Sequence, residues 1–418
     1  MNRRDILKIP AFVSIFGAFS ANGFCESGVH KKKLEYLVNA YFDHADSLML
    51  EYGYSSEDLI SYFEKHTLML LSLAYIQTFG TSINSPQWVP YIPFYLPWGI
   101  PNPDDVYKNT FIDSDATYRL RGKKGSATIA KLTMKDGGAH LGEISSGKTL
   151  AEIDINELES DSSGNFEIYL GKNGSKYHDR QFYVLHQNTT QLMYRSVTKN
   201  SSQFDPNISI ERLDYKGVDF YQDALDFERT LTAMFRFASV QIEFLLKFKK
   251  KRIDLGSDSG FIFDEAQVDH GGMPDQKYLF YTFSLGKDDV LILESEVPDK
   301  YKYWNVMLFD EFCNGINAVY HQSSLNDEQV RIDEDGVIRV VVSHQDPGVH
   351  NWLDTCGWAT GGIMWRWNNA SSYPKPKIRK INRKELFDNL PSGVQRIDVD
   401  ERRKLLGDRI HHYQSRLI

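Results

Sequence analysis

The sequence predicts an α+β fold of several parts, in which antiparallel β-sandwich domains carry an N-terminal helix pair, a long central helix and a C-terminal helix. Two observations predict it. Residues 101–215 and 256–370 contain short runs of alternating apolar and polar side chains, divided by Gly, Asn, Asp and Ser, which is typical of antiparallel strands. Residues 33–80, 216–255 and parts of 371–418 instead place apolar side chains three and four positions apart, which is typical of helices.

The composition allows a large globular body. The chain has 418 residues, of which 41% are hydrophobic and 25% charged, so it can bury a sizeable core. Its net charge of −8 argues against a general nucleic-acid binder, because phosphate binding needs a basic face. We therefore expect no nucleic-acid partner.

The first 25 residues are expected to be a twin-arginine-like export signal. Arg3 and Arg4 precede Ile6, Leu7 and Lys8, and an apolar stretch ends in small residues suited to cleavage. This predicts a periplasmic or secreted protein, with no transmembrane segment after signal removal, since no later run reaches the roughly 18 apolar residues that span a bilayer.

Export also bears on the two cysteines that follow the signal region. In an oxidising compartment Cys313 and Cys356 could form a disulfide. Two separate thiols remain the alternative.

Residues 28–100 are predicted to hold the helix pair and then an extended strap. Ser55 to Asp58 supply an N-terminal cap with acids in the first turn of the second helix. Residues 86–105 contain six prolines and five aromatic residues, which excludes a helix or a central strand. The strap either joins two domains or forms an aromatic rim around a ligand cleft, made of Trp88, Tyr91, Tyr95 and Trp98.

The β-rich domain predicted at 101–215 carries a pair of arginines. In the strand YRLRG, Arg119 and Arg121 share one face while Tyr118 and Leu120 share the other. Their forked donors could bind a carboxylate, sulfate or phosphate. A solvated sheet face is the alternative.

A long helix is predicted within 216–255, long enough to cover one face of a sheet. Strands resume in the sandwich domain at 256–370. The tail at 371–418 is predicted to be a charged C-terminal helical segment.

The richest stretch of the second sandwich domain runs from 343 to 367 and reads as a loop between two strands. We predict a ligand site here with Asp354 as acid or base, Arg366 as anion stabiliser and Asn351 as a polar anchor. The predicted walls are three tryptophans: Trp352, Trp358 and Trp367.

Two alternatives stay open at this stretch. Asp354 and Arg366 could form a structural ion pair. A set of imidazole and carboxylate groups could instead hold a divalent metal: His344, Asp346, His350 and Asp354. We predict no metal and no cofactor, because no P-loop, dinucleotide fingerprint, HExxH or CxxC pair is present, and no GxSxG elbow either.

The same region resembles a bacterial family catalogued as domain of unknown function 1214. The similar elements are Tyr303 and Trp304, the SLN at 324–326, and DPG followed by NWLDT and RW within 346–367. The segments 102–125 and 192–197 resemble the amino-terminal part of longer proteins of that kind. The resemblance, over about 100–370, implies β-sandwich domains with helical additions, often in exported proteins, and no established reaction.

Taken together, the residues indicate an exported protein that binds or processes a polar ligand, a saccharide or a small anionic metabolite. The first alternative is a non-enzymatic structural or interaction protein of the cell envelope. The second is a metal-dependent enzyme.

Overall fold

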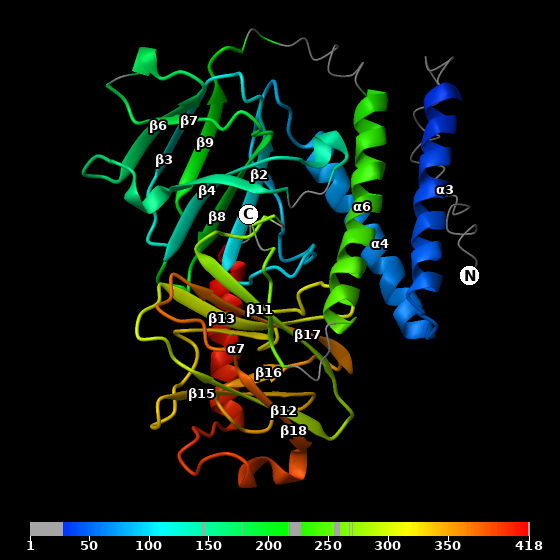
Figure 1. Cartoon of the computed structure of the whole chain (residues 1–418), viewed down its shortest axis with the longest axis vertical. Coiled ribbons are helices and arrows are strands. Elements are labelled where there is room, and N and C mark those ends of the chain that lie inside the picture. Colours follow the sequence, from blue (N-terminus) through cyan, green and yellow to red (C-terminus); the bar gives the residue numbers. More distant parts are fainter. Residues whose placement is uncertain are drawn as a thin grey trace.

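The computed structural model describes residues 28–143, 147–177, 179–215, 217, 227–254, 260–266, 268–269 and 271–416. The expected export signal at 1–25 and the expected start of the long helix at 218–226 lie outside these residues. Two β-sandwiches lie one above the other, and a layer of helices stands beside the upper one and reaches the top of the lower one (Figure 1). The predicted α+β fold is confirmed.

The first sandwich contains β1 to β9. One sheet has the strand order β1-β2-β8-β4-β5 and the other the order β7-β6-β3-β9. Every pairing is antiparallel except that of β6 with β7. The strands are β1 Val89–Pro90, β2 Asp105–Phe111, β3 Tyr118–Lys123, β4 Ile129–Lys135, β5 Thr149–Asp154, β6 Asn165–Gly171, β7 Phe182–Val184, β8 Gln191–Val197 and β9 Asn207–Arg212.

The second sandwich contains β10 to β18. Its sheets have the orders β10-β11-β17-β13-β14 and β16-β15-β12-β18. Three tryptophans fill its core, with ring centroids of Trp304 and Trp365 5.4 Å apart and Trp367 against both. The strands are β10 Ile262–Phe263, β11 Gln276–Ser284, β12 Asp289–Glu296, β13 Tyr303–Phe309, β14 Ser324–Asn326, β15 Val337–Ser343, β16 Trp352–Asp354, β17 Thr360–Asn368 and β18 Lys377–Asn382.

The strand β18 corrects the sequence-based prediction of a wholly helical tail at 371–418. It pairs antiparallel with β12 along its full length, from Lys377 opposite Glu294 to Asn382 opposite Asp289. The free edge of β12 would otherwise leave backbone N–H and C=O groups without partners, and pairing satisfies them.

The helical layer consists of α3 (Gly28–Glu51), α4 (Glu57–Phe79) and α6 (Phe227–Asp254). The Ser56 side chain accepts from the Leu59 N–H and begins α4, as the cap motif predicts. Short 3-10 turns join other elements: η1 Ala139–Leu141, η2 Ile155–Glu157, η3 Ser175–Tyr177 and η5 Arg383–Asp388.

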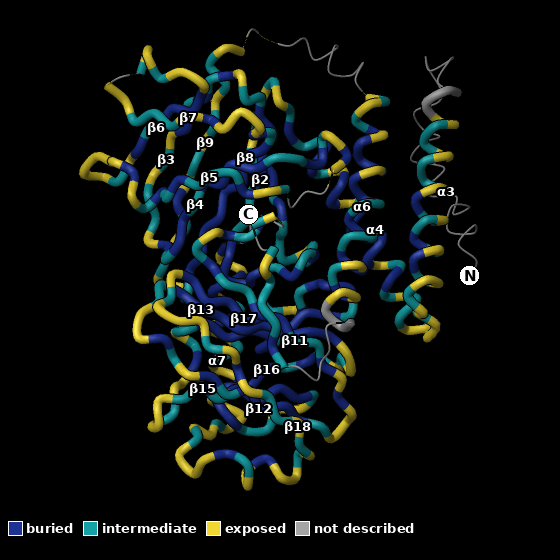
Figure 2. Tube along the Cα trace, viewed as in Figure 1, coloured by how far each residue is buried: buried dark blue, intermediate teal, exposed yellow. Residues whose placement is uncertain are grey.

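One hydrophobic cluster unites the helices with both sandwiches. It contains α6 side chains, Met193 of β8, Met364 of β17 and the strap residues Tyr91 and Trp98. The inner strands β8, β13 and β17 are therefore buried on both faces. In Figure 2 the buried residues are dark blue, and they gather where β13 and β17 lie. The strap covers apolar surface between the domains, as predicted for residues 86–105.

The C-terminal helix α7 (Val399–Gln414) fastens the two sandwiches together. Asp398 and Glu401 form a capping box at its start. Arg402 pairs with Asp346 of the second sandwich at 2.8 Å, whereas Arg416, just beyond the helix, pairs with Asp205 of the first at 2.8 Å. None of the described helices is long and apolar enough to cross a membrane.

Candidate functional site

The predicted pair of Asp354 and Arg366 does not form. Asp354 lies in β16 and Arg366 in β17, which belong to opposite sheets of the second sandwich. The Arg366 guanidinium donates to Asn305 Oδ1 at 3.3 Å and to the Ile100 carbonyl at 2.9 Å. Asp354 Oδ2 instead lies 2.8 Å from His321 Nδ1. Both the shared site and the structural ion pair predicted for these two residues are therefore wrong.

The predicted tryptophan walls are also dispersed. Trp367 points into the sandwich core, on the opposite face of β17 from Arg366, because neighbouring side chains of a strand alternate. Trp358 instead packs edge-on against Tyr62 of α4, with the two ring centroids 4.7 Å apart.

Asn351 and Trp352 hold the loop rather than line a site. The Asn351 side chain binds three backbone groups, the N–H and C=O of Arg331 and the C=O of Arg339. The Trp352 indole N–H donates to Ser343 Oγ at 3.0 Å, and its ring lies under the Arg402 guanidinium.

The paired arginines of β3 lie on a solvated face. Tyr118 and Leu120 are buried, as the alternation predicts. Arg119 bonds Glu211 of β9 at 2.6 Å, and Arg121 lies 3.8 Å from the same carboxylate. Because a neighbouring strand already supplies their anion, the arrangement favours the alternative reading over an anion site.

No disulfide joins Cys313 and Cys356. The Cys313 thiol lies against the Leu245 carbonyl of α6, whereas Cys356 lies beside Asp354. The histidines of the proposed metal set are also engaged separately, His344 with Thr355 and His350 with the Gln329 carbonyl. These four predicted ligands do not converge.

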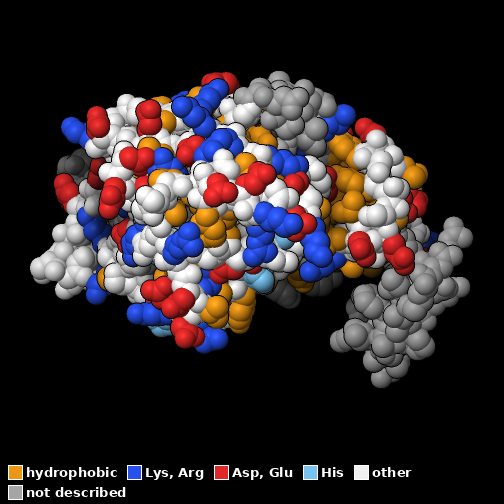
Figure 3. All heavy atoms as spheres, turned by 90° about the horizontal axis from the view of Figure 1, so that it is seen from below, with side chains coloured by type: hydrophobic (Ala, Val, Ile, Leu, Met, Phe, Trp, Pro, Cys, Tyr) orange, Lys and Arg blue, Asp and Glu red, His pale blue; other side chains and the backbone are white. Residues whose placement is uncertain are grey.

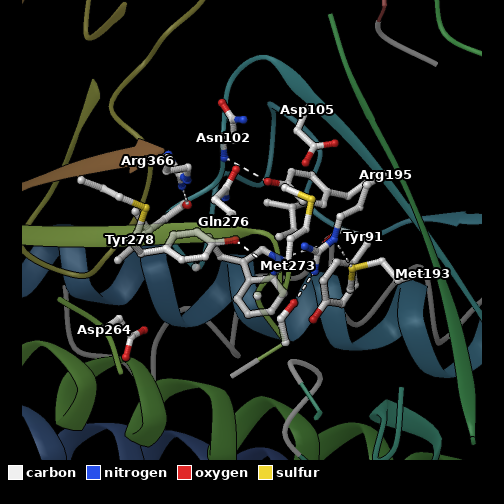
Figure 4. Close-up of a pocket in the computed structure, with 18 of the residues that line it drawn as sticks. Tyr91, Asn102, Asp105, Met193, Arg195, Asp264, Met273, Gln276, Tyr278 and Arg366 are labelled. Carbon is white, nitrogen blue, oxygen red and sulfur yellow. Dashed lines mark hydrogen bonds between the residues drawn. The ribbon is translucent and has the colours of Figure 1, made fainter. Parts of the chain in front are cut away.

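A cavity of about 140 Å³ lies where the two sandwiches meet α6, with Arg366 in its wall (Figure 4). The strap, β2, β4 and β8 contribute residues from one side, β11 and β17 from the other. Its polar and charged lining residues are Asn102, Asp105, Lys135, Arg195, Asp264, Gln276 and Arg366, and its aromatic ones are Tyr91, Trp98, Tyr107, Phe244, Phe248, Tyr278 and Phe280.

Strand alternation brings the cations to this cavity. In β8, Leu192 and Tyr194 enter the core of the first sandwich, so Met193 and Arg195 face the helical side. In β17, Ile363, Trp365 and Trp367 enter the second core, so Met364 and Arg366 face the same side. The two inner sheets thus each present one methionine and one arginine to a shared space.

Three basic side chains of the wall are almost wholly buried. Lys135, Arg195 and Arg366 are 1%, 5% and 3% exposed. Among the described residues, no carboxylate lies within 4.0 Å of these three groups. Arg195 donates to the Gly271 carbonyl, and burial together with the neighbouring Arg195 charge lowers the pKa of Lys135 well below its usual value.

The carboxyl group of Asp105 responds to the same burial. Desolvation raises its pKa to about 7, although the charges of Arg195 and Arg416 act in the opposite direction. A carboxyl group that titrates near neutral pH in a cavity is a candidate acid or base. Asp354, predicted for that role, lines no part of the cavity.

Two tyrosines lie within electrostatic reach of both arginines. The Arg195 guanidinium lies 5.9 Å from the Tyr107 ring, and the Arg366 guanidinium lies 5.8 Å from the Tyr278 ring. Burial raises the pKa of both phenols, so both stay protonated. Each oxygen accepts one backbone N–H, from Asn102 or Met273. The Tyr107 phenol also interacts with the Asp105 carboxyl group, and the Tyr278 phenol with Gln276.

The strap is strained where it meets Arg366. Ile100 has φ of +56°, which is costly for a β-branched residue, and follows Gly99 at φ +72°. The Ile100 N–H donates to the Cys313 carbonyl at 2.8 Å, while its carbonyl accepts from Arg366. These two hydrogen bonds hold the strained conformation and direct the Ile100 carbonyl toward the guanidinium.

A second cavity of about 110 Å³ adjoins the first and shares Ile92, Asp105 and Tyr107 with it. Trp88 and Tyr95 line this second cavity, whereas Tyr91 and Trp98 line the first. The four aromatic side chains of the strap therefore line two spaces and do not form a rim around one cleft.

Sequence reasoning missed Lys135, Arg195, Asp105 and Tyr278. A usable signal was present in β8, where Arg195 interrupts a strand that is otherwise buried along its whole length. This signal could not be connected with Arg366, because Arg366 lies more than 160 residues further along the chain and the sequence does not show that the two strands meet.

Comparison with known proteins supports the fold and one family. Residues 283–369 match the model of a family described as protein of unknown function (DUF1214). An uncharacterised protein from Burkholderia cenocepacia has a similar solved structure, with TM-score 0.75 and 21% identity over 84% of this chain and 99% of that one.

A protein from Vibrio parahaemolyticus has TM-score 0.44 and 13% identity, over 75% of this chain and 100% of that one. No curated protein matches the sequence. The resemblance noted at 303–367 lies within residues 283–369, the segment that matches the DUF1214 family model.

Proposed function

We propose that the chain binds a small organic anion with an apolar or aromatic body in the cavity between the two sandwiches and α6. One observation carries this proposal: Lys135, Arg195 and Arg366 line one space, and among the described residues none of the three has a carboxylate within 4.0 Å, although Asp105 lines the same space.

Burial of unpaired charge makes an anionic ligand favourable. Taking a guanidinium or ammonium group out of water costs several kcal/mol unless an opposite charge compensates it. Guanidinium groups bind carboxylate, sulfate and phosphate oxygens through paired, charge-assisted hydrogen bonds. An anion between Arg195 and Arg366 would supply the missing compensation.

The remaining wall favours an apolar or ring-bearing body. Phe244 and Phe248 of α6, Phe280 of β11 and Trp98 of the strap surround the charged groups. Ligand sites commonly combine such an apolar lining with a few polar groups that fix orientation. Of the two ligand classes that the sequence indicates, the cavity favours the anionic metabolite over a neutral saccharide.

The molecule as a whole is not basic. On the face shown in Figure 3, acidic and basic side chains are interspersed, and the whole chain has a net charge of −8. We place the activity in the periplasm or outside the cell, a proposal that rests on the twin-arginine-like residues 1–25.

The test compares anions with neutral molecules of similar shape. Thermal unfolding of the purified chain is measured with benzoate, phenyl phosphate and phenyl sulfate, and with benzamide and phenol as neutral counterparts. At least one anion is expected to raise Tm in a concentration-dependent way, because a ligand that binds only the folded state stabilises it. Its neutral counterpart is expected to have no such effect.

The Arg366→Gln variant tests the position of binding. It is expected to lose the anion-dependent rise in Tm, whereas Arg119→Gln, on the solvated face of β3, keeps it. Equal shifts from anions and neutral molecules, or an unchanged response in Arg366→Gln, would contradict the proposal.

A second candidate is a structural or interaction protein of the cell envelope. Its support is that the DPG and NWLDT residues make intramolecular contacts: Asp346 accepts from the Gly348 N–H and pairs with Arg402 of α7. If no anion raises Tm, and Asp346→Ala lowers the stability of the chain without any other effect, this candidate replaces the first.

A further inference from the structure

We propose that His321, Asp354 and Cys356 form a binding site for one divalent transition-metal ion of the zinc class. One potential ligand atom from each residue lies within 4.8 Å of the other two. None of the three lines the anion cavity, so this site is separate from the proposed function.

Local hydrogen bonds already orient the carboxylate of this cluster. Asp354 Oδ1 accepts from the Cys356 N–H at 2.8 Å, which turns Oδ2 toward His321 Nδ1, also at 2.8 Å. The Asp354 N–H donates to the Gln322 carbonyl at 2.9 Å. This backbone bond ties the segment that carries His321 to the end of β16, so the three side chains converge from two chain segments.

The ligand set identifies the class of metal. Thiolate and imidazole groups suit Zn²⁺ and similar transition metals, whereas Mg²⁺ and Ca²⁺ prefer sites made wholly of oxygen ligands. Two anionic ligands, a thiolate and a carboxylate, would balance the charge of a divalent ion. Three protein ligands also leave a fourth tetrahedral position for water or a solute.

The present separations need only a small adjustment. Zinc bonds of about 2.0–2.3 Å at tetrahedral angles place ligand atoms roughly 3.3–3.6 Å apart. A pair at the 4.8 Å limit would approach by about 1.2–1.5 Å, whereas His321 Nδ1 and Asp354 Oδ2, now 2.8 Å apart, would separate by about 0.5 Å. Rotation of side chains can supply both movements. The His321 side chain is 43% exposed and Asp354 is 14% exposed, so an ion has access from solvent.

The test titrates the reduced, chelator-treated full chain with Zn²⁺ and, in parallel, with Co²⁺. We expect one equivalent of either ion to bind, and the Co²⁺ complex to show sulfur-to-metal charge-transfer absorption. Zn²⁺ is also expected to slow alkylation of Cys356 by a thiol reagent. Cys356→Ser and His321→Gln should each weaken binding at least about 100-fold, since loss even of a supporting contact costs about 10- to 100-fold.

Two matched variants serve as controls. Cys313→Ser removes the other described cysteine, which is buried against α6, and His411→Gln removes a histidine of α7. If Cys313→Ser does not fold, His411→Gln still serves. Both are expected to bind one equivalent with unchanged affinity.

Three outcomes would overturn the metal site: no stoichiometric binding by the unaltered chain, unchanged binding in both Cys356→Ser and His321→Gln, or equal weakening in the controls. The anion-dependent rise in Tm is measured on the same chelator-treated protein. Because that assay needs no metal, failure of one proposal leaves the other standing.

Discussion

Lys135 gives the most discriminating prediction about the cavity, because its replacement should improve stability and impair binding. The side chain is 1% exposed, and among the described residues its ammonium group forms no ion pair within 4.0 Å. The charge of Arg195 repels the ammonium group, and the more weakly acting carboxylates of Asp136 and Glu152 attract it. Methionine has a similar length and no charge, so Lys135→Met retains most of the packing and removes the buried amine.

The expected gain follows from the cost of burying charge. Replacing a buried ion pair with apolar side chains of similar volume is neutral or stabilising by about 1–4 kcal/mol. Among the described residues Lys135 has no ion-pair partner within 4.0 Å to lose, so Lys135→Met is expected to be stabilising. Lys131, four residues earlier on β4, is the matched control. It lies 3.3 Å from Asp154 and 3.6 Å from Asp275, so Lys131→Met breaks existing pairs and should lower stability.

The assay is urea unfolding at pH 7 with and without the anion that raises Tm most. Without ligand, Lys135→Met should unfold at a higher midpoint urea concentration than the unaltered chain, with an unchanged dependence of the free energy of unfolding on urea concentration. At an anion concentration of 100 times the dissociation constant, the anion stabilises the unaltered chain by about 2.7 kcal/mol and the variant by less. The difference in free energy of unfolding between the two proteins should therefore narrow or reverse. A variant less stable than the unaltered chain without ligand, or equal stabilisation of both by the anion, would refute the reasoning.

Three further predictions concern buried polar groups. Tyr413→Phe should lower the free energy of unfolding, measured with urea, by about 1.5–3 kcal/mol, because the phenol donates to buried Asp104 at 2.8 Å. The control is Tyr320→Phe, at an exposed position, which should change the free energy of unfolding little. Burial lowers the pKa of His66 to about 4, so the contribution of the neutral imidazole to stability is complete above the unfolded pKa of about 6.5 and is lost as pH falls toward 4. The free energy of unfolding should therefore fall by about 2 kcal/mol between pH 7 and 5. In His66→Gln the free energy of unfolding should lack this dependence on pH. Asp105 should change the stability in the opposite direction with pH. Because its pKa is raised to about 7, its contribution to the stability of the folded state is complete below the unfolded pKa of about 3.9 and is lost as pH rises through 7. Because ionised Asp105 repels an anion, calorimetric affinity for benzoate should fall between pH 6 and 8, and Asp105→Asn should remove that dependence.

The sequence predicted the elements that depend on local pattern. The helix pair with its Ser56 cap, the long helix, the alternating strands and the C-terminal helix all follow from side-chain periodicity and capping, which act over a few residues. It missed β18, because the edge of β12 that β18 completes lies about 90 residues earlier in the chain. Pairing across that distance overrides local preference.

The site could be predicted only in part. The sequence analysis singled out Arg366 because it lies between two tryptophans, and the structure places it in the cavity wall. Its partners could not be identified, because Arg195 and Lys135 come from the other sandwich and only packing of the two inner sheets against α6 brings them together. Asp354 was assigned to Arg366 because they lie near each other in sequence, although they belong to opposite sheets.

The central claim is that Arg195 and Arg366 hold an organic anion between the two sandwiches. The most direct test is a crystal structure of the chain soaked with para-iodobenzoate, whose iodine is located by anomalous scattering. We predict the carboxylate between the two guanidinium groups and the iodine among the α6 aromatic side chains Phe244 and Phe248. An empty cavity at a concentration that raises Tm, or iodine bound elsewhere with the cavity unoccupied, would contradict the account.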